Sequence, residues 1–512
     1  MHPSVSRIAL ITAGFLLVGT PVAGQRPPVP AAPVARDLTP AREDVRRLPA
    51  PAIEEVLPAE NSVEFFTGAR FHGDVLALER FRPGYRFWTH VFSHPDGSIV
   101  FGSAETGALL ASFPARGDWA HEGRYSQEGI EELVADRSFP RRLGDRRDHV
   151  AEIIEPFTGP VIHNPTRGNF VSPNVGLYGG FLEEWGRIYE RFGVPADLGL
   201  AQALVESGFS GDVKSEARAI GFCQFLPRNW QRLDRLTDHV IEVENQTTQA
   251  AYCAAYLAVL ATKYGSFVPA LSEHHAGSTN VGRTVINGTR MGGEDVRERY
   301  LLGAQFAKEV RALSPRTFRD VVGTYGPRSY LYAEMIFGNM ETVADIRDGR
   351  AQETIHAMRV DRDVSLSDIV RRTGISEREV KRFNPALVRR VPRGATLYLP
   401  EYREEFGRDV AFWHRDAGPD YQEVLYDFLQ LGAPLEDWDS PAFEAVLDGF
   451  RQRFRATETE EGRVMDAVIG YVIQEIPLLH RQLSAYRTDP EIDRLFERGM
   501  QLRAEDARDA RR

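Results

Sequence analysis

The sequence has no excess of basic residues. Its 62 Lys and Arg stand against 73 Asp and Glu, which gives a formal net charge of −11. Proteins that bind nucleic acid usually present a basic surface to the phosphate backbone, so this balance argues against a nucleic-acid partner. The overall charge favours no acidic polymer either, and we expect shape and hydrogen bonds to hold any ligand.

Long apolar runs are also missing. The exception, Ile8–Gly19, is 12 residues long and is too short to span a bilayer comfortably. It follows the weakly basic "MHPSVSR" and precedes small residues at Val22 and Gly24, a pattern typical of a secretory signal peptide over residues 1–24. We therefore expect an exported periplasmic protein with no transmembrane span after cleavage. An uncleaved membrane anchor is the alternative.

Cysteine is scarce, with only Cys223 and Cys253 in the chain. They form no CxxC motif and lie 30 residues apart. In an oxidising compartment a disulfide closing such a loop would contribute roughly 3–4 kcal/mol. Two separate buried thiols are an equally open interpretation.

Composition divides the rest of the chain into segments. We expect a multidomain, mainly α protein, with the "RFWTHVFSHPDGSIVFGSA" stretch forming a hairpin around a Pro-Asp-Gly turn. The predicted parts are a Pro/Ala-rich linker (25–58), a mixed α/β region of unknown role (60–160), a helical domain (173–340), a strand–helix–helix–strand unit (353–400) and a charged helical region of unknown role (401–512).

A long helix is predicted over Thr247–Tyr264, with Asn245 as its N-terminal cap. Small and apolar residues recur on one face at helical spacing, which indicates core packing. This apolar stripe comprises Ala250, Cys253, Ala254, Leu257, Leu260, Ala261 and Tyr264.

The stretch "LAQALVESGFSG" (Leu200–Gly211) ends an apolar helical run on one acid, Glu206. A carboxylate at a helix C-terminus lies in the negative field of the carbonyl dipoles, and partial burial raises its pKa further. Both effects favour a protonated side chain near neutral pH, as a general acid requires. An exposed glutamate at a helix end without a role is the alternative.

The order "ALVESGF", "ARAIGFCQFLP", "NQTTQAAYCAAYLAVLATKYG" and "ALSEHHAGSTNVGR" resembles the catalytic domain of lytic transglycosylases, the lysozyme-like SLT fold. The resemblance implies that Glu206 is the catalytic acid/base and that Ser207 and Gln224 lie beside the sugar. The later "GPRSYLYAEMIFGN" resembles the family's segment with a tyrosine near the catalytic glutamate, which places Tyr330 in that role.

The segment "EHHAG" departs from the family. His274 stands where the family has tyrosine, and His275 where it has an asparagine that supports the N-acetyl group of the sugar. A neutral histidine imitates that amide, whereas a protonated one adds positive charge. The "EHH" spacing matches neither H-E-x-x-H nor H-x-x-E-H, so we expect no metal site, and no cofactor is implied.

A second resemblance covers "LSDIVRRTGISEREVKRFNPALVRRVPRGATLYLP" (366–400), which is similar to the LysM module that binds glycans containing N-acetylglucosamine. The usual Gly-Asp-Thr is replaced by Asp363, Val364 and Ser365. A LysM fold acting only as a spacer is the alternative.

Together the resemblances imply a peptidoglycan lytic transglycosylase that makes 1,6-anhydro ends on glycan strands, with one carboxylate, Glu206, acting as acid and then as base. Asp212 and Glu216 are the close candidates for a second carboxylate and are expected on a solvated loop. Cell-wall proteins could bind the flanking regions. A muramidase- or chitinase-like hydrolase, or a non-catalytic wall-binding scaffold, are the competing hypotheses.

Overall fold

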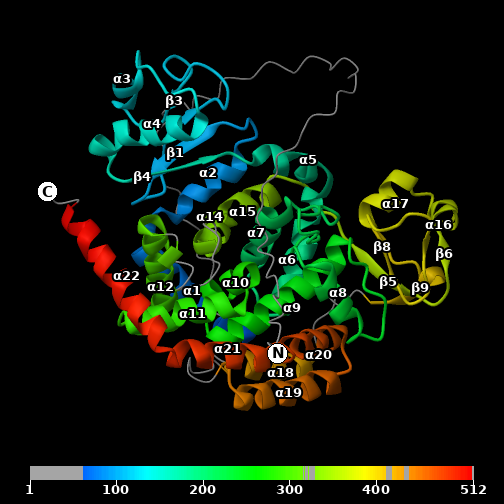
Figure 1. The fold of residues 1–512 in the computed structure, drawn as a ribbon. Helices are drawn as coiled ribbons and strands as arrows, with labels where there is room; N and C mark the ends of the chain where they lie inside the picture. The colour runs from blue at the N-terminus through cyan, green and yellow to red at the C-terminus, as the bar shows by residue number, and fades with distance from the viewer. Residues whose placement is uncertain are drawn as a thin grey trace, which may run out of the picture.

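The computed structural model describes residues 62–314, 316–317, 321, 329–410, 418–431 and 438–509. The predicted signal peptide (1–24) and linker (25–58) lie outside these residues. The described chain is mainly helical, as the sequence predicted, and carries small sheets at two places (Figure 1).

The first helix, α1 (Val63–Phe81), packs inside the main helical body. Its Asp74 is fully buried and accepts hydrogen bonds from Ser266 Oγ at 2.6 Å and from the Phe267 amide at 2.7 Å. The same carboxylate pairs with Arg297 Nε at 2.6 Å. Asp74 thus binds the start of α10 (Phe267–Ala276) and pairs with an arginine of α12 (Val296–Leu313). Helix α1, which was predicted to belong to a separate N-terminal region, therefore forms part of the helical core.

A four-stranded antiparallel sheet follows. One of its two inner strands, β1 (Ile99–Ser103), has all five residues buried. Because successive side chains point to opposite faces of a strand, both faces of β1 are covered. Phe101 packs in a small core with the sheet's own helices, whereas Val100 faces the main body. The sheet order is β3-β2-β1-β4, with β2 (Leu109–Phe113), β3 (Arg124–Tyr125), β4 (Val161–Pro165), α3 (Ile130–Val134) and α4 (Leu143–Thr158).

The hairpin predicted around Pro-Asp-Gly is wrong. The segment before the turn is the helix α2 (Trp88–Ser93), preceded by the short helix η1 (Pro83–Phe87). Trp88, Val91 and Phe92 are buried together at helical spacing. Their aromatic and β-branched character favours a strand locally, but packing on one helical face decided otherwise. The actual hairpin joins β1 to β2.

The predicted long helix is α9 (Gln246–Tyr264). Asn245 caps it as predicted, because its Oδ1 accepts from the amides of Thr247 at 2.9 Å and Thr248 at 3.2 Å. Every residue of α9 is buried, not only the predicted stripe. The helices α6, α10 and α20 pack around it, and α20 comes from the far end of the chain.

The main body also contains the helices that surround α9 and those that continue the chain around it. They are α5 (Gly168–Tyr178), η2 (Gly179–Phe181), α6 (Leu182–Arg191), α7 (Ala196–Ser207), α8 (Pro227–Asp234), α10 (Phe267–Ala276), α11 (Ser278–Arg290), α12 (Val296–Leu313), η3 (Ser329–Leu331), α14 (Tyr332–Gly338) and α15 (Met340–Asp348).

A small unit at one end of the molecule has its own apolar core (Figure 1). Its strand–helix–helix–strand order agrees with the sequence pattern, and a third strand, β9, extends its sheet in the order β8-β5-β9. The elements are β5 (His356–Val360), β6 (Val364–Ser365), α16 (Leu366–Thr373), α17 (Glu377–Phe383), β7 (Arg390–Val391), β8 (Thr396–Leu399), η4 (Glu404–Phe406) and β9 (Gly407–Asp409).

The C-terminal helices lie against the main body rather than apart from it (Figure 1). α20 packs on α9, α21 on α11 and α22 on α12. Trp438 lies under the buried Lys263 ammonium of α9, 4.8 Å from nitrogen to ring centre. The elements are α18 (Pro419–Leu429), α19 (Pro441–Ala456), α20 (Glu460–Ile473), α21 (Ile476–Thr488) and α22 (Pro490–Asp509).

In the described ranges, no single helix is long and apolar enough to cross a membrane. The bent pair α9 and α10 passes that test only when the two are taken together, and both are core helices in this fold.

Substitution of Asp74 by Ala is expected to destabilise the protein by about 3–5 kcal/mol, because it leaves the partly buried Arg297 guanidinium and the start of α10 without their acceptor. Urea unfolding of the full chain measures this. Glu64→Ala, an exposed acid on the same helix, is the control and is expected to change stability by less than about 0.5 kcal/mol. Equal effects of the two substitutions would contradict the role of Asp74.

Candidate active site

Glu206 occupies the last turn of α7, and only 7% of the residue is exposed. The helix ends two residues later at Gly208, whose φ of 56° is left-handed and whose amide donates to the Leu204 carbonyl at 2.9 Å. The turn brings Phe170 of α5 against Gly208, where an added Cβ would lie 3.1 Å from the Phe170 ring. A side chain would be strained at this left-handed φ and would also push the Phe170 ring aside, so glycine suits the turn.

The Glu206 carboxyl has two neighbours, and both contact Oε1. Tyr332 Oη donates a hydrogen bond at 2.5 Å, and His274 Nε2 lies 3.7 Å away. Burial raises the pKa of Glu206 to about 7, although the hydrogen bond from Tyr332 favours the charged form. Glu206 therefore titrates near neutral pH, where it can both give and take a proton.

His274 is an uncharged neighbour of this carboxyl. Burial, together with the adjacent His275, lowers the pKa of His274 to about 3. The ring packs against Phe225 at 5.6 Å and Tyr256 at 5.8 Å between ring centres. Because the imidazole is neutral, it adds no positive charge beside Glu206 and does not stabilise the carboxylate as an ion pair would.

The His275 ring packs against Tyr332. The two rings stack at 4.5 Å with an interplanar angle of 11°. Burial and the nearby Glu206 charge raise the pKa of Tyr332 well above its usual value, so the phenol remains a neutral donor. Gln202 Nε2 approaches the same phenol oxygen at 3.5 Å. The two histidines thus share Tyr332 as a partner, because the His274 ring lies beside Glu206 and is also nearly parallel to Tyr332, with 6.4 Å between ring centres.

The tyrosine that contacts Glu206 is Tyr332 and not Tyr330, which corrects the sequence-based assignment. Tyr330 lies in the short helix η3 and packs in a separate core with Phe306 and Val310. Two residues along a helix turn a side chain through about 200°, so the neighbouring tyrosines point to opposite sides. The segment "SYLY" contains both tyrosines, and only the direction of α14 shows which of them meets Glu206.

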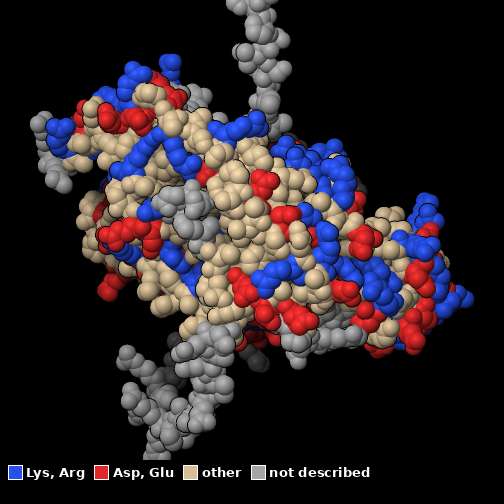
Figure 2. Space-filling model, turned by 90° about the horizontal axis from the view of Figure 1, so that it is seen from below, with Lys and Arg blue, Asp and Glu red and all other residues tan. Residues whose placement is uncertain are grey.

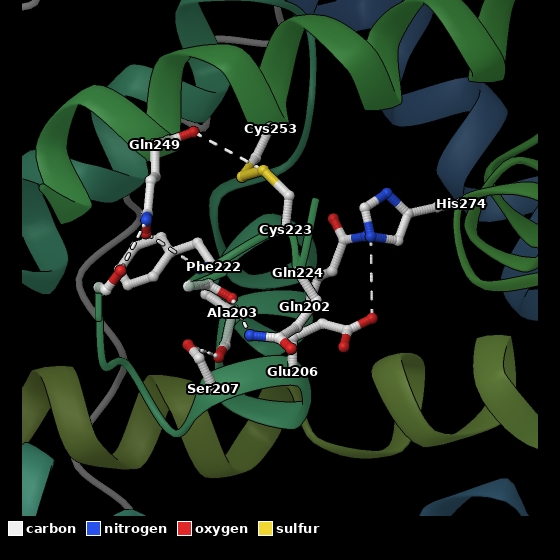
Figure 3. Close-up of a disulfide and its surroundings, with 12 residues drawn as sticks. Gln202, Ala203, Glu206, Ser207, Phe222, Cys223, Gln224, Gln249, Cys253 and His274 are labelled. Atoms are coloured by element: carbon white, nitrogen blue, oxygen red, sulfur yellow. Dashed lines mark hydrogen bonds and ion pairs between the residues drawn. A yellow bond between two sulfur atoms is a disulfide. The ribbon is translucent and has the colours of Figure 1, made fainter. Parts of the chain in front are cut away.

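The Ser207 side chain lies in the core of the protein. The residue is fully buried, and its hydroxyl donates to the Ala203 carbonyl one turn back at 2.9 Å (Figure 3). The contact between Ser207 and a sugar stays a prediction, and the buried hydroxyl gives it no support. Residues 206 and 207 differ by about 100° around the helix, which turns Ser207 into the core.

Gln224 uses its amide nitrogen to hold its own loop. Nε2 donates to the carbonyls of Gly221 at 3.0 Å and Val213 at 3.3 Å. Gln224 itself has a φ of 45°, a left-handed conformation that costs energy for a residue other than glycine. Its Oε1 is buried with no hydrogen-bond partner among the described residues. Contact between Gln224 and a ligand stays a prediction, and the oxygen is the atom available for it.

A disulfide joins Cys223 to Cys253, with 5.6 Å between the Cα atoms. It ties the loop that carries Gln224 to α9, one helical turn from Gln249 (Figure 3). The Gln249 side chain accepts from the Phe222 amide at 3.0 Å and donates to the Gly211 carbonyl at 2.8 Å. The sequence left the pairing of the cysteines open, and the structure forms the bond.

Three residues of the site escaped the sequence reasoning: Gln202, Gln249 and Tyr332. Gln249 precedes Cys253 by four positions and so continues the apolar stripe of α9 with a polar residue, a signal that was present. Gln202 likewise precedes Glu206 by four positions on one face of α7. Tyr332 had no local signal that separated it from Tyr330.

No group of three or more His, Cys, Asp or Glu side chains within the described part of the chain is arranged to hold a metal ion. The Glu206 and His274 pair stands with a tyrosine and aromatic rings, which offer too few donors for a metal.

Residues 183–293 match the family model described as Transglycosylase SLT domain. The match covers α6 to α11 and includes Glu206, Gln224 and both histidines, but Tyr332 lies beyond it. It supports a lysozyme-like, lytic transglycosylase catalytic domain and indicates a function of that type in peptidoglycan degradation. No curated protein matches the chain.

Tyr332→Phe is expected to move the alkaline limb of the pH–activity profile upward, because loss of the donated hydrogen bond removes an interaction that lowers the pKa of Glu206. It should also reduce the rate about 10-fold or more, the usual worth of a hydrogen bond to a charged group. The profile measured on peptidoglycan tests both. Tyr330→Phe is the matched control, and the assignment fails if Tyr330→Phe shifts the profile and Tyr332→Phe does not.

Replacement of both cysteines by Ala is expected to destabilise the fold by roughly 3 kcal/mol, since the disulfide closes a 30-residue loop. Urea unfolding with and without reductant measures the loss. Reductant should destabilise the parent protein and leave the double variant unchanged. An equal response of the two proteins to reductant would show that no disulfide forms.

Proposed function

We propose that the protein is a peptidoglycan lytic transglycosylase that cleaves the β-1,4 bond between N-acetylmuramic acid and N-acetylglucosamine, with Glu206 as its single acid/base. The observation that carries the proposal is the buried Glu206 at the end of α7, with a pKa of about 7 and a hydrogen bond from Tyr332. The match to the SLT domain supplies the substrate class.

In the first step the protonated Glu206 gives its proton to the glycosidic oxygen, and the bond from that oxygen to the muramic acid C1 breaks. Both protein neighbours contact Oε1, so we place the transferred proton on Oε2. The N-acetyl carbonyl of the muramic acid stabilises the developing cation, as in substrate-assisted glycosidases. Tyr332 continues to donate to the carboxylate that forms.

In the second step the Glu206 carboxylate takes the proton of the C6 hydroxyl of the same sugar, and that oxygen bonds to C1. The product carries a 1,6-anhydro ring, no water is consumed, and Glu206 is protonated again. A pKa near neutrality suits both halves of this cycle. The neutral His274 supports it as well, because a cation 3.7 Å away would hold Glu206 in its ionised form.

The nearby acids give little support to a two-carboxylate mechanism. Asp212 and Glu216 are both exposed on the loop after α7, and Asp212 accepts a hydrogen bond from Ser210 Oγ at 2.7 Å. A hydrolase on this fold is therefore the weaker of the two enzymatic hypotheses.

We further propose that residues 353–400 form a LysM glycan-binding module and that the protein acts in the periplasm after signal-peptide cleavage. The strand–helix–helix–strand order of the small unit supports the first part, and the N-terminal sequence supports the second. The roles of residues 60–160 and 401–512 would be to complete and cover the catalytic body, because helices in the described parts of both regions pack on it.

The proposal is tested by digestion of purified peptidoglycan with the full chain, followed by mass analysis of the products. Fragments that end in 1,6-anhydro-N-acetylmuramic acid are expected. Reducing muramic acid ends would indicate a hydrolase, and binding without any cleavage would indicate a scaffold.

Glu206→Gln should lower the cleavage rate by at least about 100-fold, since it removes the acid/base group. It should also stabilise the protein at alkaline pH. The folded-state pKa of about 7 lies above the ordinary value of 4.5, so ionisation costs stability as the pH rises through this window. At pH 8 the variant is expected to be more stable than the parent by about 3 kcal/mol, and at pH 4 equally stable.

Urea unfolding at the two pH values measures the difference. The control is Glu216→Gln, the exposed acid that competes as a second carboxylate. It is expected to leave both the rate and the pH dependence unchanged. Loss of cleavage in Glu216→Gln would favour a two-carboxylate hydrolase.

A further inference from the structure

A hollow of about 650 Å³ lies where the small unit meets the main body. It is lined by the end of α5, the segment that leads out of α15 and the outer face of α17. We call it the junction hollow. Its polar lining consists of four basic and two acidic side chains, Arg350, Arg378, Lys381, Arg382, Glu353 and Glu379.

The walls of the junction hollow are fixed by specific contacts. Arg382 reaches across from α17, donating to the Leu177 carbonyl and to Glu353 Oε1, each at 3.0 Å. The Glu353 amide donates to the Gly180 carbonyl at 2.7 Å. An added Cβ on Gly180 would lie 2.5 Å from Glu353 Oε1 and 3.2 Å from the Ala351 carbonyl oxygen, so the two segments approach closely here. The hollow is therefore a built feature of the fold.

The two acids of the lining are already used. Arg382 pairs with both Glu353 and Glu379, which leaves one net negative charge on these three groups, and Lys381 pairs with Glu377. Arg350 and Arg378 have exposed side chains, and none of the ion pairs found among the described residues involves either one. The junction hollow therefore presents unused positive charge, although the chain as a whole carries −11. The small unit lies at the right of Figure 1, and Figure 2 shows charged side chains of both signs crowded on that side of the molecule.

Polar contacts connect the hollow to the end of α7 that carries Glu206. Tyr178 lines it and hydrogen-bonds with the Gln246 side chain. Gln246 Nε2 in turn approaches the carbonyl of Phe209, three residues after Glu206, at 3.4 Å. Helix α5 gives the length of this path, because Phe170 contacts the turn after Glu206 and Tyr178 lies eight residues on, about 12 Å along the axis.

We propose that the junction hollow binds the carboxylates of peptidoglycan stem peptides while the glycan strand lies at Glu206. This rests on the proposed function. The sugar backbone of an intact strand is neutral, since the lactyl group of each muramic acid is amidated, and the strand's negative charge lies on its peptides. Guanidinium groups bind carboxylates through paired hydrogen bonds. Arg350 and Arg378 recognise the peptide, and Tyr178 supplies an apolar surface beside it.

The test measures binding of soluble glycan strands to the full chain by fluorescence anisotropy. All proteins carry Glu206→Gln so that the strands are not cleaved. One probe keeps its stem peptides, and the other is the same strand after amidase removal of the peptides, which leaves one free lactyl carboxylate on each muramic acid. The test variant adds Arg350→Ala and Arg378→Ala. The control adds Arg481→Ala and Arg508→Ala, two exposed arginines on α21 and α22 that remove the same charge.

We expect the test variant to bind peptide-bearing strands about tenfold more weakly and bare strands unchanged. The control should match the parent on both probes. Added salt should weaken the binding of peptide-bearing strands more in the parent than in the test variant, because it screens the charge of the two arginines. Equal weakening on both probes, an equal effect of the control, or no preference of the parent for peptide would each overturn the inference.

The proposed function is judged separately, on the parent protein with intact Glu206. A chain that binds peptide-bearing strands through the arginines but never cleaves them retains the inference and loses the catalytic proposal. A chain that makes anhydro ends at the same rate on both kinds of strand, with or without the two arginines, loses only the inference.

Discussion

The arrangement of this protein depends on burying one carboxyl group, Glu206, without giving it a counter-ion. A carboxylate in a low-dielectric site is costly, so the side chain holds its proton up to a pH of about 7. The two side chains that contact this carboxyl are both neutral. Tyr332 is a neutral donor, and His274 is kept neutral by its own burial among aromatic rings. A cation at either place would favour the ionised form of Glu206 and work against the acid role that we propose for it.

Much of the surrounding structure serves to keep that carboxyl in place. The loop after α7 doubles back on α9 and is held there by the disulfide and by Gln249. α9 is in turn enclosed on every side, since α20 from the C-terminal region completes its packing. α1 from the other end of the chain secures the start of α10, the helix that bears both histidines. Segments outside the matched SLT region are therefore part of the same helical body.

The small unit is positioned by a few polar contacts with the main body. Glu242, on the catalytic side, accepts from Thr248 Oγ at 3.0 Å and from the Thr396 amide, and Thr248 Oγ also lies 2.6 Å from Tyr398 Oη. These buried contacts fix the unit beside α5 and create the junction hollow between them. A glycan strand held by both parts would meet a local excess of positive charge that the net charge of the chain conceals.

The sequence by itself determined what local patterns encode: the mainly helical fold, the cap of α9 by Asn245, and an acid at the end of an apolar helix. It also raised the pairing of Cys223 with Cys253 as one of two possibilities. Only the tertiary structure decided which tyrosine meets Glu206, that Ser207 faces the core, and that residues 88–93 are helical. Periodicity shows that a residue belongs to an element, but the partner it meets depends on how distant elements cross. The burial that sets the pKa values of Glu206 and His274 arises from those crossings.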